Sequence, residues 1–216
     1  MYRLLALPTF ALAAACTAAP SPAQPGPVEE VSVADARAAG AGATVLVEGI
    51  VTVPPGIFDG GFAIQDRTGG LWVLPLPTGV PLRLGQRVRV HGTLDTPNGQ
   101  LSLQASAVQA LGMRPVPAAR PLPTGSVDAG AEGWLVRVRG RVQGEPVDDA
   151  PWGWKVVLDD GSGPVRVFVD ADTDVDPAGF PRGETVEVTG FVGRYAEALE
   201  ILPRARGDVR AQPPPR

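Results

Sequence analysis

Arginine residues recur at every second position in two segments of the chain that have the pattern of β-strands. One segment carries Arg137, Arg139 and Arg141, and the other carries Arg87 and Arg89. Because alternate side chains of a strand share one face of a sheet, each set of guanidinium groups is expected to point the same way. A row of this kind could contact successive phosphates of a nucleic acid. The same spacing is also typical of solvated strand surfaces, so both interpretations stay open.

Aromatic side chains accompany these arginines, and they could hold flat ligands by stacking. Bases and sugar rings both stack on aromatic side chains, and each stacked base contributes roughly 1–3 kcal/mol. Aromatic residues also fill the cores of small barrels, and we expect a core position for Phe62 and Trp134. Trp152 lies between Pro151 and Gly153 in a loop, so we expect it to be exposed. The candidate stacking and basic residues are Phe58, Trp72, Trp152, Trp154, Lys155 and Tyr195.

Residues suited to catalysis are scarce. The chain has one histidine, His91, and one cysteine, Cys16. His91 falls on the same outward face as Arg89, and a general base there would need an orienting partner that the sequence does not indicate. No glycine-rich phosphate loop, zinc-ligand spacing or serine elbow is found in the sequence. We therefore expect a protein without enzymatic activity and without a cofactor.

Four aspartates alternate in one short segment, which is the one pattern that resembles a metal site. Oxygen ligands at this spacing could surround a calcium ion. A calcium loop of the EF-hand type would have glycine at the sixth position and glutamate at the twelfth, but Val175 and Pro181 stand there. We expect a solvated loop, and a weak calcium site is the alternative. The four residues are Asp170, Asp172, Asp174 and Asp176.

A short phrase of alternating apolar residues with one glycine recurs four times and defines the elements that would position these side chains. Apolar residues at every second position predict a strand with one buried face. A glycine on that face lets the backbone bend or approach another strand closely, as strands that coil around a small barrel require. The phrase occurs twice in each half of the chain, which predicts one small barrel built twice. Its glycines are Gly49, Gly92, Gly140 and Gly190.

Each half of the chain has the pattern of five strands. A short helix that Ser32 caps and that ends near Ala39 precedes the first set. Five strands with a connection between the third and the fourth match the plan of the OB-fold, so the expected fold is all-β, with two tandem five-stranded OB-fold-like barrels. Two immunoglobulin-like sandwiches are the alternative, although each would need about seven strands. The expected strands are residues 44–53, 62–66, 71–74, 86–94 and 100–109, then 134–143, 154–158, 165–169, 184–192 and 198–202.

The first half also resembles a known family. Residues 47–56 read Val-Glu-Gly-Ile-Val-Thr-Val-Pro-Pro-Gly, and residues 62–71 read Phe-Ala-Ile-Gln-Asp-Arg-Thr-Gly-Gly-Leu. These segments closely resemble OB domains appended to bacterial extracellular nucleases, and the second half is similar to a more divergent copy. The resemblance covers about residues 28–210, and the catalytic domains of those nucleases have no counterpart here. It implies a ligand face on the outer side of strands 2 and 3 with the two flanking loops.

The N-terminal residues resemble a bacterial lipoprotein signal. Arg3 precedes an apolar run, and small residues lead up to Cys16. Ala13 stands where the lipid-attachment motif usually has leucine, so an ordinary secretory signal is the alternative. The resemblance implies export, lipidation of Cys16 and attachment to a membrane of the cell envelope through the lipid alone. The expected segments are a signal peptide (1–15), a disordered tether (16–27), a first barrel (28–112), a proline-rich linker (113–127), a second barrel (128–210) and a proline-rich tail (211–216).

The charge balance limits the choice of partner. The chain has 19 basic and 23 acidic residues, and 16 of the acids fall in the second barrel against 10 basic residues. An acidic protein needs a local basic face to bind nucleic acid, because phosphate contacts supply most of that affinity. The leading hypothesis is a binding protein for single-stranded nucleic acid or oligonucleotides outside the cytoplasm. A protein- or glycan-binding structural module of the envelope is the alternative.

Overall fold

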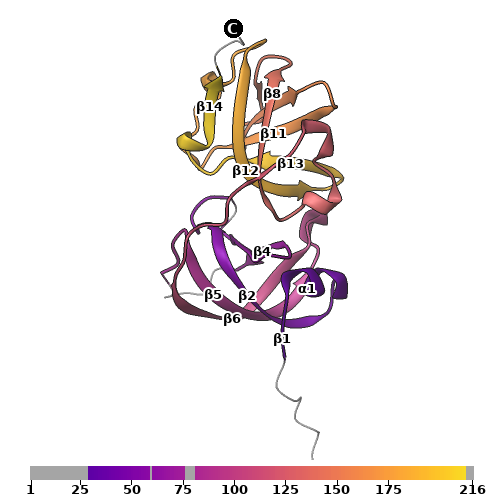
Figure 1. The fold of residues 1–216 in the computed structure, drawn as a ribbon, viewed down its shortest axis with the longest axis vertical. Coiled ribbons are helices and arrows are strands. Elements are labelled where there is room, and N and C mark those ends of the chain that lie inside the picture. Colours follow the sequence, from indigo (N-terminus) through magenta and orange to yellow (C-terminus); the bar gives the residue numbers. More distant parts are fainter. Residues whose placement is uncertain (1–28, 59, 76–80, 213–216) are drawn as a thin grey trace, which may run out of the picture.

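A computed structural model describes residues 29–58, 60–75 and 81–212 of the chain. Two β-barrels follow one another along the long axis of the molecule, the first built from the indigo to magenta segments and the second from the orange to yellow ones (Figure 1). The fold is therefore all-β, as the alternating pattern predicts. The expected signal peptide, tether and end of the proline-rich tail lie outside the described residues. No helix in the part of the chain that the structure describes is long and apolar enough to cross a membrane.

The first barrel closes through five strands. β2, β3 and β4 pair antiparallel in sequence, β4 pairs parallel with β6, and β5 pairs antiparallel with both β6 and β2. The parallel pairing joins the third and fifth strands of the barrel, so no edge is left open among these five. Their bounds are β2 (Thr44–Val53), β3 (Phe62–Gln65), β4 (Gly70–Leu74), β5 (Gln86–Asp95) and β6 (Ser102–Met113).

The second barrel repeats the same pairing plan. β8, β10 and β11 pair antiparallel in sequence, β11 pairs parallel with β13, and β12 pairs antiparallel with both β13 and β8. Two closed five-stranded barrels of this topology confirm the OB-fold-like prediction and exclude two immunoglobulin-like sandwiches. The bounds are β8 (Leu135–Val142), β10 (Gly153–Asp159), β11 (Pro164–Asp170), β12 (Thr185–Tyr195) and β13 (Ala198–Leu202).

The four repeated glycines lie where another strand crosses closely against the buried face. All four are buried. A Cβ atom added at Gly92 would lie 2.2 Å from the backbone oxygen of Gln104 on β6, and one added at Gly190 would lie 2.7 Å from that of Leu202 on β13. At Gly49 and Gly140 the added atom would lie 3.0 Å from the neighbouring strand. The prediction that these glycines permit close strand approach is confirmed.

Shorter elements extend both barrels. The predicted helix is present as α1 (Val33–Ala39), and the Ser32 side chain caps it by accepting from the amide of Asp35. Four short edge strands were not predicted from the sequence: β1 (Glu30–Val31), β7 (Arg120–Pro121), β9 (Val147–Asp148) and β14 (Val209–Gln212). The 3-10 turns are η1 (Pro97–Gly99), η2 (Thr124–Ser126), η3 (Ala129–Ala131), η4 (Pro177–Gly179) and η5 (Arg206–Asp208).

The second part of the expected linker packs on the second barrel. β7 pairs parallel with β8, and the Thr124 hydroxyl donates to a carboxylate oxygen of Asp160 at 2.8 Å. Ala131 belongs to the core of the second barrel. The Arg120 guanidinium lies 4.4 Å above the ring of Trp134, a cation–π contact. The chain is thus joined to the second barrel well before residue 128.

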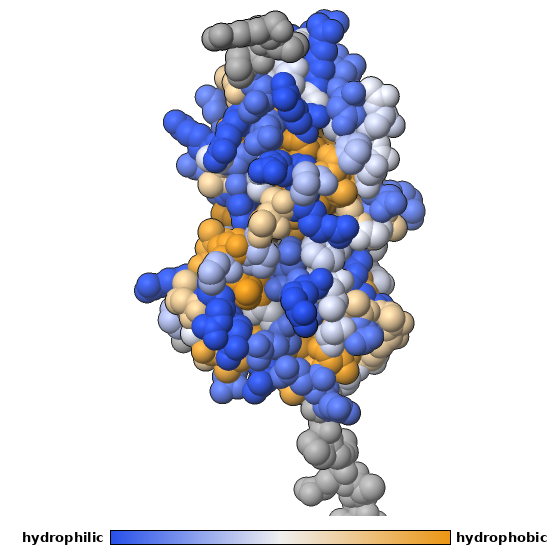
Figure 2. Space-filling view, in the orientation of Figure 1, coloured by the Kyte–Doolittle hydropathy of each residue, from blue (hydrophilic) through white to orange (hydrophobic). Residues whose placement is uncertain are grey.

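Apolar side chains from both barrels meet in a cluster at the junction. Trp72 on the outer face of β4 lies 5.4 Å from Phe191 of β12, measured between ring centroids, and 6.3 Å from Phe58. Val53 and Ala63 complete the buried part of this cluster. Hydrophobic residues also reach the surface near the narrowed junction between the barrels (Figure 2). The first barrel therefore buries part of its outer face against the second.

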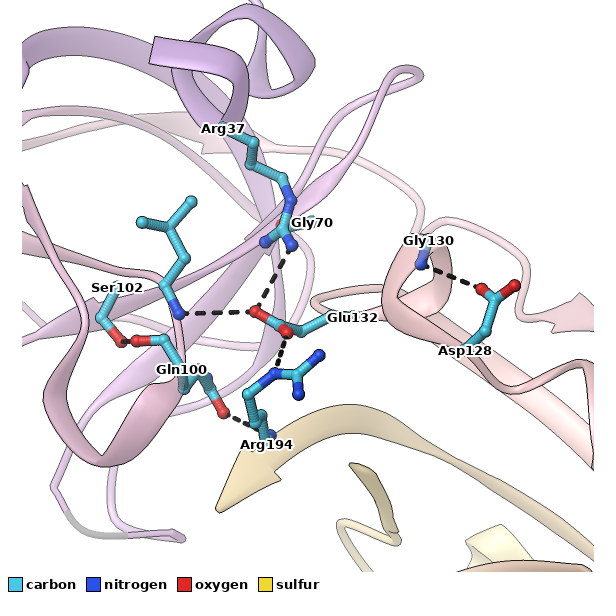
Figure 3. Close-up of polar contacts among 9 residues, drawn as sticks. Arg37, Gly70, Gln100, Ser102, Asp128, Gly130, Glu132 and Arg194 are labelled. Atoms are coloured by element: carbon cyan, nitrogen blue, oxygen red, sulfur yellow. Dashed lines mark hydrogen bonds and ion pairs between the residues drawn. The ribbon is translucent and has the colours of Figure 1, made fainter. Parts of the chain in front are cut away.

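A buried carboxylate joins the barrels beside this cluster. Glu132, which is 5 % exposed, lies just after η3. Its Oε2 atom accepts from Nε of Arg194 at 2.6 Å, and Oε1 lies 3.4 Å from a guanidinium nitrogen of Arg37 on α1 (Figure 3). Gln65 of β3 adds a second bridge, because its side-chain oxygen accepts from the amide of Leu135 at 2.9 Å. These bonds hold the two barrels in one arrangement.

Candidate ligand-binding groove

A groove of about 600 Å³ lies between the two barrels. Its floor is the outer face of β10 and β11, and its walls include the loop before β10, the turn between β12 and β13, and the η1 loop of the first barrel. Strands 2 and 3 of an OB-fold, with the loops after strands 1 and 4, are where oligonucleotides and oligosaccharides bind. The groove is thus the expected ligand face of the second barrel. Its aromatic lining consists of Phe58, Trp72, Trp152, Phe168, Phe191 and Tyr195.

Strand alternation places the residues of the floor. In β11 the valines at 165, 167 and 169 are buried in the barrel, so Arg166 and Phe168 face outward. Lys155 of β10 lies opposite Phe168 in the register of the two strands. A basic side chain and an aromatic ring therefore lie together on the floor, next to Arg166.

Two aromatic side chains stand exposed on the loops that flank this floor. Trp152 is 66 % exposed in the loop before β10, which confirms its expected exposure. Tyr195 is 67 % exposed at the end of β12. Large apolar surfaces left open on loops beside a groove are characteristic of ligand contacts. These two residues and Lys155 are the predicted site residues that the structure brings together on an accessible surface.

The cations of the groove already have carboxylate partners. Lys155 Nζ lies 2.7 Å from Asp149, and a guanidinium nitrogen of Arg166 lies 2.9 Å from Glu200. Arg194 pairs with Glu132. The charged residues of the lining are three cations (Lys155, Arg166 and Arg194) and three carboxylates (Asp149, Asp170 and Glu200), so its formal charges cancel.

Three strained backbone positions surround the groove. Among the described residues, the non-glycine residues with positive φ are Phe58 (58°), Asn98 (52°) and Ala196 (52°). Phe58 and Asn98 line the groove, and Ala196 follows Tyr195. The Ala196 amide donates to the backbone oxygen of Asn98 at 2.7 Å, so the loops after the fourth strands of the two barrels touch. Left-handed conformations of such residues are costly and concentrate at functional sites.

The matching face of the first barrel is covered. Phe58 is 4 % exposed and Trp72 is 6 % exposed, because both pack against Phe191 and its neighbours from the second barrel. We expected these two side chains to form an open stacking surface. The structure instead gives them a structural role, with only a small part of each reaching the groove. The contact was invisible in the sequence because it depends on how the two barrels meet.

Trp154 also lies apart from the groove. It is adjacent to Lys155 in β10, so the two side chains point to opposite faces, and Trp154 packs against the core of the second barrel. We expected both to contribute to one ligand face. Phe62 is fully buried in the first core, as predicted. Trp134 was also expected in a core, but it is only partly buried and packs against the second core.

The two arginine rows differ in their partners. On β5, Arg89 forms ion pairs with Glu30 at 2.7 Å and with Glu48 at 3.4 Å, and Arg87 pairs with Glu48 at 3.4 Å. This row is therefore neutralised on the surface. The β8 row, formed by Arg137, Arg139 and Arg141, is exposed and lies outside the groove.

The remaining polar candidates make local contacts. His91 Nδ1 lies 2.7 Å from the hydroxyl of Ser106 on β6. In the aspartate run, Asp170 accepts from the amide of Asp172, Asp174 from the amide of Arg206, and Asp176 from the amide of Ala178. Within the described ranges, no three histidine, cysteine or acidic residues are grouped so that they could hold a metal ion.

Among the aromatic and basic residues of the groove, four were missed by the sequence analysis: Arg166, Phe168, Phe191 and Arg194. Arg166 and Phe168 could have been found, because the predicted strand 165–169 already placed them opposite the buried valines. Alternation in the predicted strand 184–192 also places Phe191 outward, but the contacts of Phe191 and Arg194 with the first barrel could not be predicted.

Comparison with known proteins gives similarity of fold alone. No family model matches this chain, and no curated protein matches it. Among solved structures, it is similar to the hypothetical protein ygiW from E. coli, at 16% identity over 38% of this chain and 90% of that one, with a TM-score of 0.34. It is similar to a murine DNA binding protein bound with double-stranded DNA, at 14% identity over 79% and 98% of the two chains (TM-score 0.38). It is also similar to p202 HIN1 in complex with 12-mer double-stranded DNA, at 11% identity over 79% and 95% (TM-score 0.40).

Proposed function

We propose that this chain is a non-catalytic binding protein that takes single-stranded nucleic acid or oligonucleotides in the groove of its second barrel. The observation that carries the proposal is the pair of exposed rings, Trp152 and Tyr195, on the two loops that flank the β10–β11 face. In a stacking site of this kind, successive bases lie on aromatic side chains while nearby cations contact the backbone.

The floor of the groove fits this use. Phe168 offers a further ring, and Lys155 and Arg166 lie beside it. Both partners of the Lys155–Asp149 pair are about a third exposed, so this surface ion pair contributes little to stability. A phosphate could therefore replace Asp149 as the partner of Lys155 at small cost, whereas Glu200 is buried and would keep its pairing with Arg166. The contacts between the loops of the two barrels leave the groove already formed before a ligand arrives.

A glycan is the second candidate ligand. The observation that favours it is the cancellation of formal charge in the lining, because a groove for polyanions usually carries an excess of cations. Sugar rings stack on the same aromatic side chains, and carboxylates such as Asp149 accept hydrogen bonds from sugar hydroxyls. In this case the chain would be a protein- or glycan-binding structural module of the cell envelope.

The location of the protein is part of the proposal. Export and lipidation at Cys16 are supported by the resemblance of the first residues to a lipoprotein signal, and these residues lie outside the described part of the chain. Expression of the full chain with a labelled fatty acid tests the assignment. We expect the natural chain to carry the fatty-acid label and to associate with membranes, and the Cys16→Ser variant to do neither. A natural chain without the label would contradict lipidation.

Fluorescence anisotropy with a labelled single strand tests the ligand. We expect micromolar binding that weakens as salt rises between about 50 and 200 mM. Trp152→Ala with Tyr195→Ala should weaken binding at least tenfold, because two stacking contacts of about 1–3 kcal/mol each are lost. Met113→Ala removes another exposed apolar side chain that lies outside the groove, and should leave affinity unchanged. Absence of strand binding together with tryptophan fluorescence changes on glycan titration would favour the second candidate.

A further inference from the structure

A basic surface lies outside the groove on the second barrel, across β8, β12 and β14. In the strand register, Arg139 of β8 lies opposite Glu187 of β12, and Glu187 lies opposite Arg210 of β14. Paired residues in neighbouring strands share one face of a sheet, so these three side chains form a row across it. Arg137 and Arg141 extend the row along β8 on both sides. We call these four arginines the arginine face.

The arginine face differs from the arginine row on β5 because its guanidinium groups lack ion pairs. Within the described residues, none of its four guanidinium groups lies within 4.0 Å of a carboxylate oxygen, whereas Arg87 and Arg89 on the first barrel are both paired. The one polar contact found for the face is from Arg141 Nε to the backbone oxygen of Gly183, at 2.8 Å.

Three carboxylates lie among or beside these four arginines. Glu187 lies within the face, Asp159 of β10 lies opposite Arg141 in the strand register, and Asp160 lines the same hollow as Arg139 and Arg141. Both aspartates already accept hydrogen bonds from backbone amides of their own turn. The neighbours of Glu187 on the same side of β12 are the uncharged Thr185 and Thr189. Four cations against these three carboxylates leave a small local excess of positive charge on the more acidic half of an acidic protein.

We propose that the arginine face binds the phosphodiester backbone of nucleic acid. Alternate residues of a strand are about 6.6 Å apart, which is similar to the spacing of successive phosphates along an extended strand. Guanidinium groups match phosphate oxygens with two parallel hydrogen bonds. The threonines and Glu187 between the arginines offer no ring for stacking. The face therefore holds the backbone without reading bases, and it accepts single strands and duplexes alike.

The inference rests on the proposed nucleic-acid ligand, and it adds a separate contact surface outside the groove. Stacking contacts depend little on salt, but each phosphate contact releases counterions and adds to the salt dependence. The slope of log affinity against log salt changes by about 0.9 per phosphate contact on duplex DNA and about 0.7 on a single strand. The two surfaces can thus be distinguished in one experiment.

The test measures anisotropy of a labelled strand of about 20 nucleotides, and of its duplex, over a range of salt concentrations. The test variant is Arg137→Gln/Arg139→Gln/Arg141→Gln. We expect it to flatten the slope by roughly 2 for the single strand and by nearly 3 for the duplex. The matched control is Arg87→Gln/Arg89→Gln. These two arginines have the same spacing, but carboxylates already pair with them. We therefore expect the control to leave the slope unchanged.

The outcomes separate the two proposals. If the triple variant keeps the natural slope, or if the control flattens it equally, the arginine face is not a backbone site. If the triple variant flattens the slope while Trp152→Ala/Tyr195→Ala binds normally, the arginine face is supported and the groove is not. If neither the single strand nor the duplex binds the natural chain at low salt, the proposals for the groove and for the arginine face are both wrong.

Discussion

The indole ring of Trp72 and the phenyl ring of Phe191 lie 5.4 Å apart across the junction of the two barrels. The first ring belongs to the outer face of β4 and the second to β12, so one barrel occupies the ligand face of the other. The corresponding outer face of the second barrel borders the groove and is not covered in this way.

Removal of one ring at this junction should destabilise the protein. Phe191 is 2 % exposed, and replacement of a buried phenylalanine by alanine costs about 3–5 kcal/mol. We expect Phe191→Ala to lower the free energy of unfolding by that amount in urea denaturation. Tyr195→Ala, four residues further along but exposed, should change it by less than about 0.5 kcal/mol. Equal effects of the two changes would contradict the buried junction.

The corners of the barrels can be tested with glycine substitutions. Gly92→Ala would place a Cβ atom 2.2 Å from the Gln104 backbone oxygen, so the strands must separate. We expect a loss of about 2–4 kcal/mol, because the strain falls on backbone and not on a flexible side chain. Gly144→Ala is the control, since an added Cβ atom there would meet nothing within 4 Å. A Gly92→Ala variant as stable as the control would show that the close approach is not real.

These glycines also show how much of the fold the sequence predicts. Period-two alternation fixes the inward residues of the ten barrel strands, and the glycines mark where strands cross, so the barrel plan follows from local pattern. Edge strands such as β1 and β14 have two to four residues, too few to show a period. Their pairing depends on neighbours that the sequence does not identify.

The candidate site was less predictable for a physical reason. Exposure of Trp152 follows from its loop, and the outward position of Lys155 follows from alternation. Burial of Trp72 depends on contact with Phe191, far away in the sequence. The partners of Arg89 and the absence of partners for Arg139 likewise depend on which strands lie side by side.

Loss of the buried carboxylate at the junction should weaken the contact between the barrels. Glu132 accepts from two arginines that are 19 % and 22 % exposed, so water screens the pairs in part. We expect Glu132→Gln to cost about 2–3 kcal/mol in denaturation, somewhat less than an enclosed pair. Glu30→Gln removes an exposed carboxylate that is also paired with an arginine, and should cost under about 1 kcal/mol. If Glu132→Gln lowers the free energy of unfolding no more than Glu30→Gln does, Glu132 does not bridge the two barrels.

Stability should depend on pH through Asp160. Hydrogen bonds from Ser162 and then from Thr124 to its carboxylate hold the pKa of Asp160 well below its ordinary value of 3.8. Its charged form therefore stabilises the fold above that value, and this contribution is lost as pH falls through the pKa of the folded state.

The variant that tests this pH dependence is Asp160→Asn. It should be less stable than the natural chain at pH 7, and the difference should shrink below about pH 3.8, where the carboxylate of the unfolded chain is protonated. Urea denaturation at pH 7 and near pH 3 measures this, with the exposed Asp172→Asn as the control. A difference that grows on acidification would show that the hydrogen bonds to Asp160 are unimportant.

The groove is tested most directly by photocrosslinking. A single strand that carries a photoreactive thiopyrimidine is bound to the full chain at saturation, irradiated and mapped by mass spectrometry of the peptides. Stacking on the exposed rings predicts adducts at Trp152 or Tyr195. Adducts confined to residues outside the groove, with none at either ring, would contradict the account.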